Sequence, residues 1–241
     1  MTTADRWTQA VRQQLGLGRL LPLGGPRDGA WIAERAAGTL LRRAARDVPG
    51  VRLDALGIAL AHPDDPHEQP VVPPPPSALP PGGLRVTARF AATASEPLPT
   101  TSARLRTALA AAARERLGLV VTDVDLRVTD LLETEAEAAP EPPAQPRRAA
   151  GRPDDPDEDR LAAAALGVPG VDRLTAVLGR PVHLTERAGG EQAALPHRHA
   201  RVEIAVGAGH RALDVAREVR AAAAAALPDH VTVAVLVTET G

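Results

Sequence analysis

The sequence predicts an α+β protein made of two repeated α-β-β-α-β units, each a three-stranded sheet with two helices on one face. The tetrapeptide V-P-G-V occurs at 48–51 and again at 168–171, each time between an Ala-rich helical stretch and a strand-like stretch. Downstream of each V-P-G-V corner, apolar residues occupy every second position, as expected for a half-buried strand. These residues are Leu84, Val86, Ala88 and Phe90 after the first corner, and Ala200, Val202, Ile204 and Val206 after the second. Such internal similarity predicts a duplication.

A second helix follows each of these strands. Its apolar positions fall on one helical face and correspond between the halves at a constant offset: Leu105, Leu109 and Leu117, then Val215, Val219 and Leu227. Each helix leads into another alternating strand: Val124, Leu126 and Val128, then Val233, Val235 and Val237. The order of elements is therefore the same in both halves.

The first helix of each unit is expected just before its V-P-G-V corner. In the first half Asp28 is placed to cap a helix, and the residues on its apolar side are Ile32, Ala36, Leu40 and Ala44. In the second half an Asp-rich and Pro-rich lead precedes a shorter helix at 157–166, where negative charge favours a helix N-terminus. Pro49-Gly50 ends the first helix. The valines at 48, 51, 168 and 171 are expected to be largely buried, because they flank the change from helix to strand.

The predicted domain organisation has four parts: an N-terminal helix and lead-in at 1–27, a first unit at 28–132, a flexible linker at 133–156, and a second unit at 157–241. The linker is acidic, rich in Ala and Pro, and without periodicity. Residues 61–82 hold nine prolines and predict a long irregular insertion in the first unit. Residues 186–199 are a shorter loop at the same place in the second unit. Both 61–82 and 133–156 are expected to be cut first in limited proteolysis.

The N-terminal segment places Trp7, Val11 and Leu15 on one helical stripe. We expect this stripe to pack on the first unit, since apolar stripes usually serve a core. Docking on a partner or a membrane surface is the alternative.

Composition excludes several classes of chemistry. The 28 basic residues, all Arg, nearly balance the 30 acidic ones, so the whole-molecule charge favours neither a nucleic-acid binder nor a polyanion mimic. The absence of Cys excludes disulfides, thiolate metal sites and a Cys nucleophile. No apolar run reaches the length of a membrane span, and the N-terminus resembles no signal peptide, which predicts a soluble cytoplasmic protein.

Loop histidines form the one metal-like constellation. Imidazole and carboxylate groups at short spacing suit zinc or nickel, and the residues concerned are His62, Asp64, Asp65, His67 and Glu68, with His197 and His199 in the second loop. Because these side chains stand among prolines without a scaffold for a tetrahedron, we interpret them as solvated loop residues and assign no metal.

No catalytic or cofactor site is predicted either. The serines Ser77, Ser95 and Ser102 are in or beside proline-containing loops and lack a nucleophile elbow or a His-Asp order. Glycine pairs at 16–18 and 207–209 lack the rest of a phosphate-binding pattern and are interpreted as turns or helix caps.

The element order is also similar to that of KH-type RNA modules. A KH domain needs a G-x-x-G loop between two helices, and the candidate at 25–28 follows no strong helix. Aromatic residues for base stacking make up only 1% of the chain. The Arg-rich helix faces are interpreted as solvated surfaces, namely Arg42, Arg43 and Arg46, and Arg104, Arg106, Arg114 and Arg116.

The order of elements resembles the alkaline-shock protein family of bacterial envelope-stress proteins: an Ala-rich helix, V-x-G-V, two strands, a helix rich in Val, Arg and Ala, and a strand of alternating valines. The matching stretches are 32–51, 84–90 and 105–131 in one half, with 161–171 and 202–237 in the other. Members of that family usually have one such unit and no proline-rich insertion, and the family offers no catalytic signature to transfer.

The resemblance implies a non-enzymatic cytoplasmic protein that acts through protein contacts in cell-envelope stress response or homeostasis. Its implied partner is a small membrane-anchoring protein of the same family, which would hold it at the inner face of the cell membrane. No small-molecule substrate is expected. The alternatives from other classes are a nucleic-acid-binding regulator that uses an Arg-rich helix face, and a small enzyme or metal carrier that uses the loop histidines.

Overall fold

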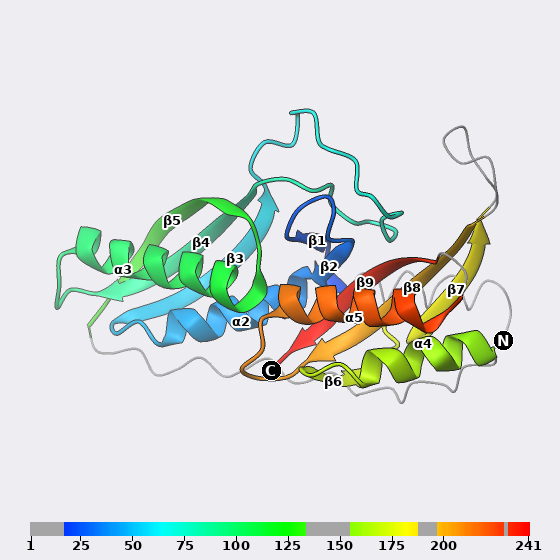
Figure 1. Ribbon diagram of the computed structural model, residues 1–241. Coiled ribbons are helices and arrows are strands. Elements are labelled where there is room, and N and C mark those ends of the chain that lie inside the picture. The colour runs from blue at the N-terminus through cyan, green and yellow to red at the C-terminus, as the bar shows by residue number, and fades with distance from the viewer. Residues whose placement is uncertain (1–16, 134–154, 188–196, 229–230) are drawn as a thin grey trace, which may run out of the picture.

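The computed structural model describes residues 17–133, 155–187, 197–228 and 231–241 (Figure 1). It is a mixed α+β structure with one six-stranded and one three-stranded sheet. The predicted helix with Trp7, Val11 and Leu15 lies outside the described residues, as does nearly all of the predicted linker at 133–156.

The three-stranded sheet has the strand order β3-β4-β5. Its strands are β3 (Val51–Leu60), β4 (Leu84–Thr93) and β5 (Val121–Leu132). β3 pairs antiparallel with β4, and β4 pairs parallel with β5. The helices beside it are α2 (Glu34–Arg46), α3 (Leu98–Ala111) and the π-helical turn η1 (Ala112–Leu117).

The predicted alternation of buried and exposed residues along β4 is confirmed. Leu84, Val86, Ala88 and Phe90 are all fully buried, whereas Thr87 and Arg89 between them are exposed. The predicted apolar face of the following helix is buried as well, at Leu105, Leu109 and Leu117. One face of this sheet therefore carries the core, and the other carries charged side chains.

The six-stranded sheet has the order β1-β2-β9-β8-β6, with β7 also paired to β8. Its strands are β1 (Leu20–Leu23), β2 (Ala30–Ala33), β6 (Val171–Leu174), β7 (Val182–Arg187), β8 (His197–Val206) and β9 (Thr232–Thr240). β6 and β7 pair antiparallel with β8, and β8 pairs parallel with β9. The helices beside it are α4 (Pro156–Leu166) and α5 (Ala212–Ala226). Asp155 caps α4 by accepting a hydrogen bond from the Asp157 backbone N–H, as its acidic lead predicts.

The prediction of the first helix is wrong at its N-terminal end. Residues 20–33 form the hairpin β1–β2, and the helix begins only at Glu34. Every residue of both strands is buried, and β2 pairs parallel with β9 of the other half. Ile32 thus faces a strand partner, Val237, instead of a helical neighbour. A four-residue apolar run fits a buried strand as well as a buried helix turn, so periodicity alone does not separate the two.

This hairpin also changes the predicted strand count. The second sheet was expected to have three strands. Instead, β1 and β2 extend it beyond β9, and the chain between the second V-P-G-V corner and β8 forms two short strands, β6 and β7, where one was expected. The predicted loop at 186–199 is likewise shorter than expected, because β7 continues through Arg187 and β8 begins at His197. Residues 188–196 are outside the described part.

The proline-rich insertion at 61–82 contains no helix or named strand. It is nevertheless attached to the hairpin at two backbone positions. Leu79 N–H donates to the Leu20 carbonyl, and Val71 N–H donates to the Pro26 carbonyl. Val72 beside the latter contact is buried. The insertion therefore covers the outer edge of β1, which would otherwise be open.

The two V-P-G-V corners share their backbone conformation. In each, the first valine N–H donates to a carbonyl three residues earlier, and the glycine has a positive φ of 71° at Gly50 and 93° at Gly170. The expected burial holds for Val48 and Val168, which are 7% and 8% exposed. It is wrong for Val51 and Val171, which are only half-buried. The second valine begins an edge strand, where one side of the chain faces solvent.

Helix α2 and the turn after η1 join the two sheets. α2 packs against both β3 and β9, and α5 packs against η1 (Figure 1). Asp28, the predicted helix cap, instead accepts a hydrogen bond from Gly25 N–H and forms a two-bond ion pair with Arg217 of α5. Burial would raise the pKa of Asp28, but the bonds from Arg217 and Gly25 outweigh it and lower the pKa.

Gly118 lies in this junction, in close contact with α5. Its φ is 89°, its carbonyl accepts from Gly24 N–H, and a Cβ placed on it would lie 2.4 Å from the Leu213 Cβ of α5. Both the conformation and the space therefore require glycine.

Gly118→Ala is expected to lower the free energy of unfolding by about 3 kcal/mol, since left-handed strain and overpacking each cost on the order of 1 to 3 kcal/mol. Chemical denaturation followed by circular dichroism measures the change. Gly57→Ala is the matched control, because Gly57 has no positive φ and a Cβ added to it would meet no atom within 4 Å. Equal effects of the two substitutions would contradict the tight junction.

Candidate functional site

The loop histidines and carboxylates whose side chains are described do not form a metal site; the side chain of His197 lies outside the described part. In the 61–82 insertion, the side chains of His62, Asp64, Asp65 and Glu68 are exposed. His67 is half-buried, and its Nε2 is buried without a hydrogen-bond partner. His199 lies on β8, where its Nδ1 is 2.9 Å from the Thr232 hydroxyl oxygen. Among the described residues no group of three or more His, Cys, Asp or Glu is placed to hold a metal ion.

The three serines lie on different elements of the fold. Ser77 lies in the proline-rich insertion, Ser95 shares a hydrogen bond with Thr93 after β4, and Ser102 is in α3. Gly207 and Gly209 form the turn between β8 and α5, as their interpretation as turn residues predicts.

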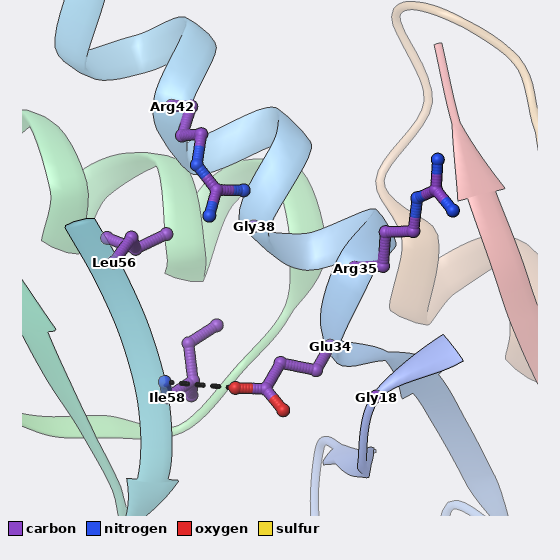
Figure 2. Close-up of a pocket in the computed structure, with 7 residues that line it drawn as sticks. All are labelled: Gly18, Glu34, Arg35, Gly38, Arg42, Leu56 and Ile58. Atoms are coloured by element: carbon purple, nitrogen blue, oxygen red, sulfur yellow. Dashed lines mark hydrogen bonds between the residues drawn. The ribbon is translucent and has the colours of Figure 1, made fainter. Parts of the chain in front are cut away.

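A hollow of about 290 Å³ lies between α2 and the edge strand β3 (Figure 2). Its lining residues are Gly18, Glu34, Arg35, Gly38, Arg42, Leu56 and Ile58. Gly38 leaves the helix surface bare, and the Arg42 guanidinium extends over it, with Nη1 3.0 Å from where a Cβ of residue 38 would be. Leu56 and Ile58 form an apolar wall opposite this guanidinium in Figure 2.

The carboxylate in the hollow is already engaged. Glu34 accepts hydrogen bonds from the backbone N–H and the side chain of Arg19, and from the Ile58 backbone N–H at 3.4 Å. Arg19 also donates to the Ile58 carbonyl. Burial would raise the pKa of Glu34, but the Arg19 bonds outweigh it and lower the pKa. The Glu34–Arg19 pair therefore forms hydrogen bonds with both the N–H and the C=O of Ile58 at the edge of β3, which is a structural role.

The arginines of the hollow are less engaged. Within the described part of the chain, the guanidinium groups of Arg35 and Arg42 have no hydrogen bond or ion pair. The hollow can therefore accept an anionic group against Arg42, but it holds no unengaged base or nucleophile.

A second polar site is buried in the six-stranded sheet at Glu203 of β8. The residue is fully buried, and its Oε2 accepts hydrogen bonds from the backbone N–H groups of Val177 and Leu178 at 2.7 and 3.1 Å. Its Oε1 lies 3.3 Å from Nη2 of Arg201 but has no hydrogen bond of good geometry. Burial raises the pKa of Glu203 to about 7, although Arg201 and the two N–H donors oppose that rise.

Other polar groups accompany Glu203. Trp31 lies on the same face, since both residues are paired with Leu236 of β9, and its buried Nε1 has no hydrogen-bond partner. His183 of β7 is opposite Arg201, and burial together with the positive charge of Arg201 lowers its pKa. Glu203 ties the loop after β6 to the sheet, and sequence reasoning did not single out any of these residues.

The outer edge of β5 is a third feature. Within the described ranges β5 is the last strand of its sheet, and its one neighbouring strand there is β4. Val128 and Leu131 on it are 36% and 57% exposed. Besides the pairing with β4, Arg106 Nε of α3 donates to the Val124 carbonyl, and the Leu131 N–H donates to the Asp130 carboxylate. An open edge with apolar side chains is a surface suited to binding another chain.

Arginines on α3 and η1 do not form the free cationic track of a nucleic-acid site. Arg104 pairs with Glu96, Arg114 pairs with Glu115, and Arg106 is used at the β5 edge. On α2 the situation differs, since Arg42, Arg43 and Arg46 have no acidic partner among the described residues.

Comparison with known proteins does not assign a function to these sites. The sequence matches no model of a protein family and no curated protein.

Proposed function

We propose that this protein is a non-enzymatic relative of the alkaline-shock family, acting through protein contacts in cell-envelope stress response or homeostasis, and that its halves are copies of one α-β-β-α-β unit. The observation that carries the proposal is the strand pairing beyond each V-P-G-V corner. After the first corner, β3 is antiparallel to β4 and β4 is parallel to β5. After the second, β6 is antiparallel to β8 and β8 is parallel to β9.

Differences between the halves are accounted for as additions to this unit. The hairpin β1–β2 is added to β9, and the proline-rich insertion covers the edge of that hairpin. The corresponding side of β5 has no such addition among the described residues. In this proposal the uncovered edge of the first unit is where contacts with other chains are made.

The proposed partner is a small membrane-anchoring protein of the same family, and the proposed location is the cytoplasmic side of the cell membrane. None of the helices in the described ranges is long and apolar enough to cross a membrane. Attachment would therefore depend on a partner, and neither a small-molecule substrate nor a cofactor is part of the proposal.

Deletion of the gene in the native host tests the role. We expect greater sensitivity to envelope-targeting antibiotics, restored by the wild-type chain, and co-sedimentation of the chain with membranes that is lost when the anchoring protein is removed. Unchanged sensitivity together with a chain that never sediments with membranes would contradict the proposal.

The second candidate is a nucleic-acid-binding regulator, and the observation that favours it is the unpaired Arg42, Arg43 and Arg46 on α2, within the described ranges. Binding through these side chains would release counterions, so its affinity should fall steeply with salt. Titration of labelled duplex DNA and RNA at low and physiological salt, with Arg43→Gln/Arg46→Gln as the variant, decides between the two. Salt-sensitive binding that the variant loses would favour the regulator.

A further inference from the structure

The β5 edge carries a charge pattern that complements itself. Asp125 and Arg127 flank Leu126, and both point to the polar face of the sheet, since Asp123, Asp125 and Arg127 alternate with the core-facing residues. When two such strands run antiparallel about a two-fold axis through Leu126, Asp125 of each copy lies opposite Arg127 of the other.

Arg127 lacks a partner among the described residues of its own chain. It lies directly opposite Arg89 of β4, so two like charges face each other across the strand pair. No ion pair or hydrogen bond involves either guanidinium in the described part of the chain. Like charges in directly opposed positions destabilise a sheet, so an additional carboxylate beside Arg127 would be favourable. Asp125 already forms an ion pair with Arg85 at 3.4 Å, but its side chain is 63% exposed and Arg85 also pairs with Asp123, so the Asp125 carboxylate can face a second guanidinium.

The backbone of β5 is oriented for the same pairing. The Val124 carbonyl is used by Arg106 instead of by β4, so it faces outward. Because N–H and C=O groups of alternate residues point the same way along a strand, the backbone groups of Leu126 and Val128 face outward too. About an axis through Leu126, Leu126 faces its own copy and Val124 faces Val128 of the other, which makes three hydrogen-bonded residue pairs.

Other registers are worse. An axis through Arg127 places Arg127 opposite itself, and an axis through Asp125 places two carboxylates together. An axis through Val128 places Arg127 opposite Thr129 and Asp125 opposite Leu131. The axis through Asp125 also sets each Arg127 opposite Asp123, but it does so at the cost of the opposed Asp125 carboxylates. Of these registers, only the axis through Leu126 forms two opposite-charge pairs without opposing like charges, while keeping apolar residues opposite apolar residues on the core-facing side.

We propose that a second copy of this chain docks on the β5 edge, forming a two-fold symmetric dimer with an antiparallel β5–β5 pair centred on Leu126 and two Asp125–Arg127 ion pairs. The two three-stranded sheets then become one continuous six-stranded sheet. The exposed Val128 and Leu131 become covered or shielded at the join, and Arg106 leaves the Val124 carbonyl. The dimer does not depend on the envelope role proposed above, because its complementarity lies within this chain.

Sedimentation equilibrium of the full chain over a wide concentration range tests the dimer. We expect concentration-dependent dimers for the wild type. Arg127→Asp and Asp125→Arg should each weaken the dimer about tenfold, because two cross-strand pairs per dimer change from attraction to repulsion.

A one-to-one mixture of the two variants is the decisive arm. One chain then carries two carboxylates and the other carries two guanidinium groups, so a heterodimer regains both ion pairs, whereas either variant alone does not. Circular dichroism melts check that both variants remain folded. Recovery of wild-type affinity in the mixture supports the register. A wild type that stays monomeric, or variants that dimerise like the wild type, would overturn it.

Introduced cysteines give an independent measurement, since the chain has no Cys of its own. Asp125→Cys mixed with Arg127→Cys should form a disulfide between chains under mild oxidation, because the two positions are directly opposed. Asp125→Cys alone should not, since the two copies of residue 125 are diagonal neighbours, about 7 Å apart and too far for a disulfide. Equal cross-linking in both cases would contradict the pairing.

Discussion

Val48→Asp is expected to lower the free energy of unfolding by about 4 kcal/mol or more. Burying a valine side chain contributes on the order of 1.5 to 3 kcal/mol, and the substitution also places a carboxylate without a partner in the core. Val48 is 7% exposed and belongs to the apolar core beneath the first corner. A loss of this size is a large part of the roughly 5 to 15 kcal/mol that stabilises a domain.

Val51→Asp, at the other end of the same corner, is the matched control. Val51 is half-buried at the start of an edge strand, so an aspartate there keeps contact with water, and we expect a loss of about 1 kcal/mol. Urea denaturation monitored by circular dichroism compares the two variants with the wild type. A larger loss for Val51→Asp than for Val48→Asp would show that the corner is packed the other way round.

The parts of the fold that periodicity specifies were predictable. β4 and β8 are long strands with one buried face, and the alternation of their apolar residues identified them directly. α4 was predictable for another reason, since a short acidic lead and a V-P-G-V corner mark both of its ends. These signals are local, so they do not depend on the rest of the chain.

The hairpin β1–β2 was missed because its stabilisation is not local. Four buried residues in each strand carry no period, and the partner that fixes β2 is β9, more than two hundred residues further along the chain. Tertiary pairing therefore decides its secondary structure. Tertiary pairing also decides the exposure of the half-buried Val51 and Val171, because it determines which strands lie at the edges of the sheets.

Sequence reasoning also missed the polar clusters. Glu203 occupies the polar phase of an alternating strand, where a solvent-exposed side chain is expected. In the fold the loop after β6 covers that face and supplies two N–H donors, so the carboxylate is fully buried. The interactions of Glu34 were likewise not predictable from the sequence, because its partners Arg19 and Ile58 come from separate parts of the chain. The charge pattern of β5 was visible, but its meaning depends on the strand being an edge.

Burial of Glu203 makes the stability of the protein depend on pH. The pKa of this carboxyl is raised from 4.5 to about 7 in the folded chain, so the folded state binds its proton more tightly than the unfolded state does. A raised pKa contributes stability that is fully present below about pH 4.5 and is lost as the pH rises through 7. This rise in pKa corresponds to about 3 kcal/mol, at roughly 1.4 kcal/mol for each pH unit.

Glu203→Gln should remove this dependence. Glutamine has no charge to bury, and its side-chain oxygen can still accept from Val177 and Leu178 N–H, so the loop after β6 keeps its attachment. Urea denaturation of both proteins between pH 4.5 and 8 measures the effect. We expect the difference in unfolding free energy, variant minus wild type, to become more positive by about 3 kcal/mol across this range.

Comparing the two proteins at each pH isolates Glu203 from other titrating groups. His183, whose pKa is lowered by burial and by Arg201, shifts the balance in the opposite direction, since its protonation at low pH disfavours the folded state. Both proteins keep His183, so its contribution cancels in the difference. The attraction between Arg201 and the ionised carboxylate already contributes to the pKa of about 7, so it leaves the expected difference unchanged. A difference that is constant from pH 4.5 to 8 would show that Glu203 stays ionised in the folded chain, held by Arg201 strongly enough to overcome its burial.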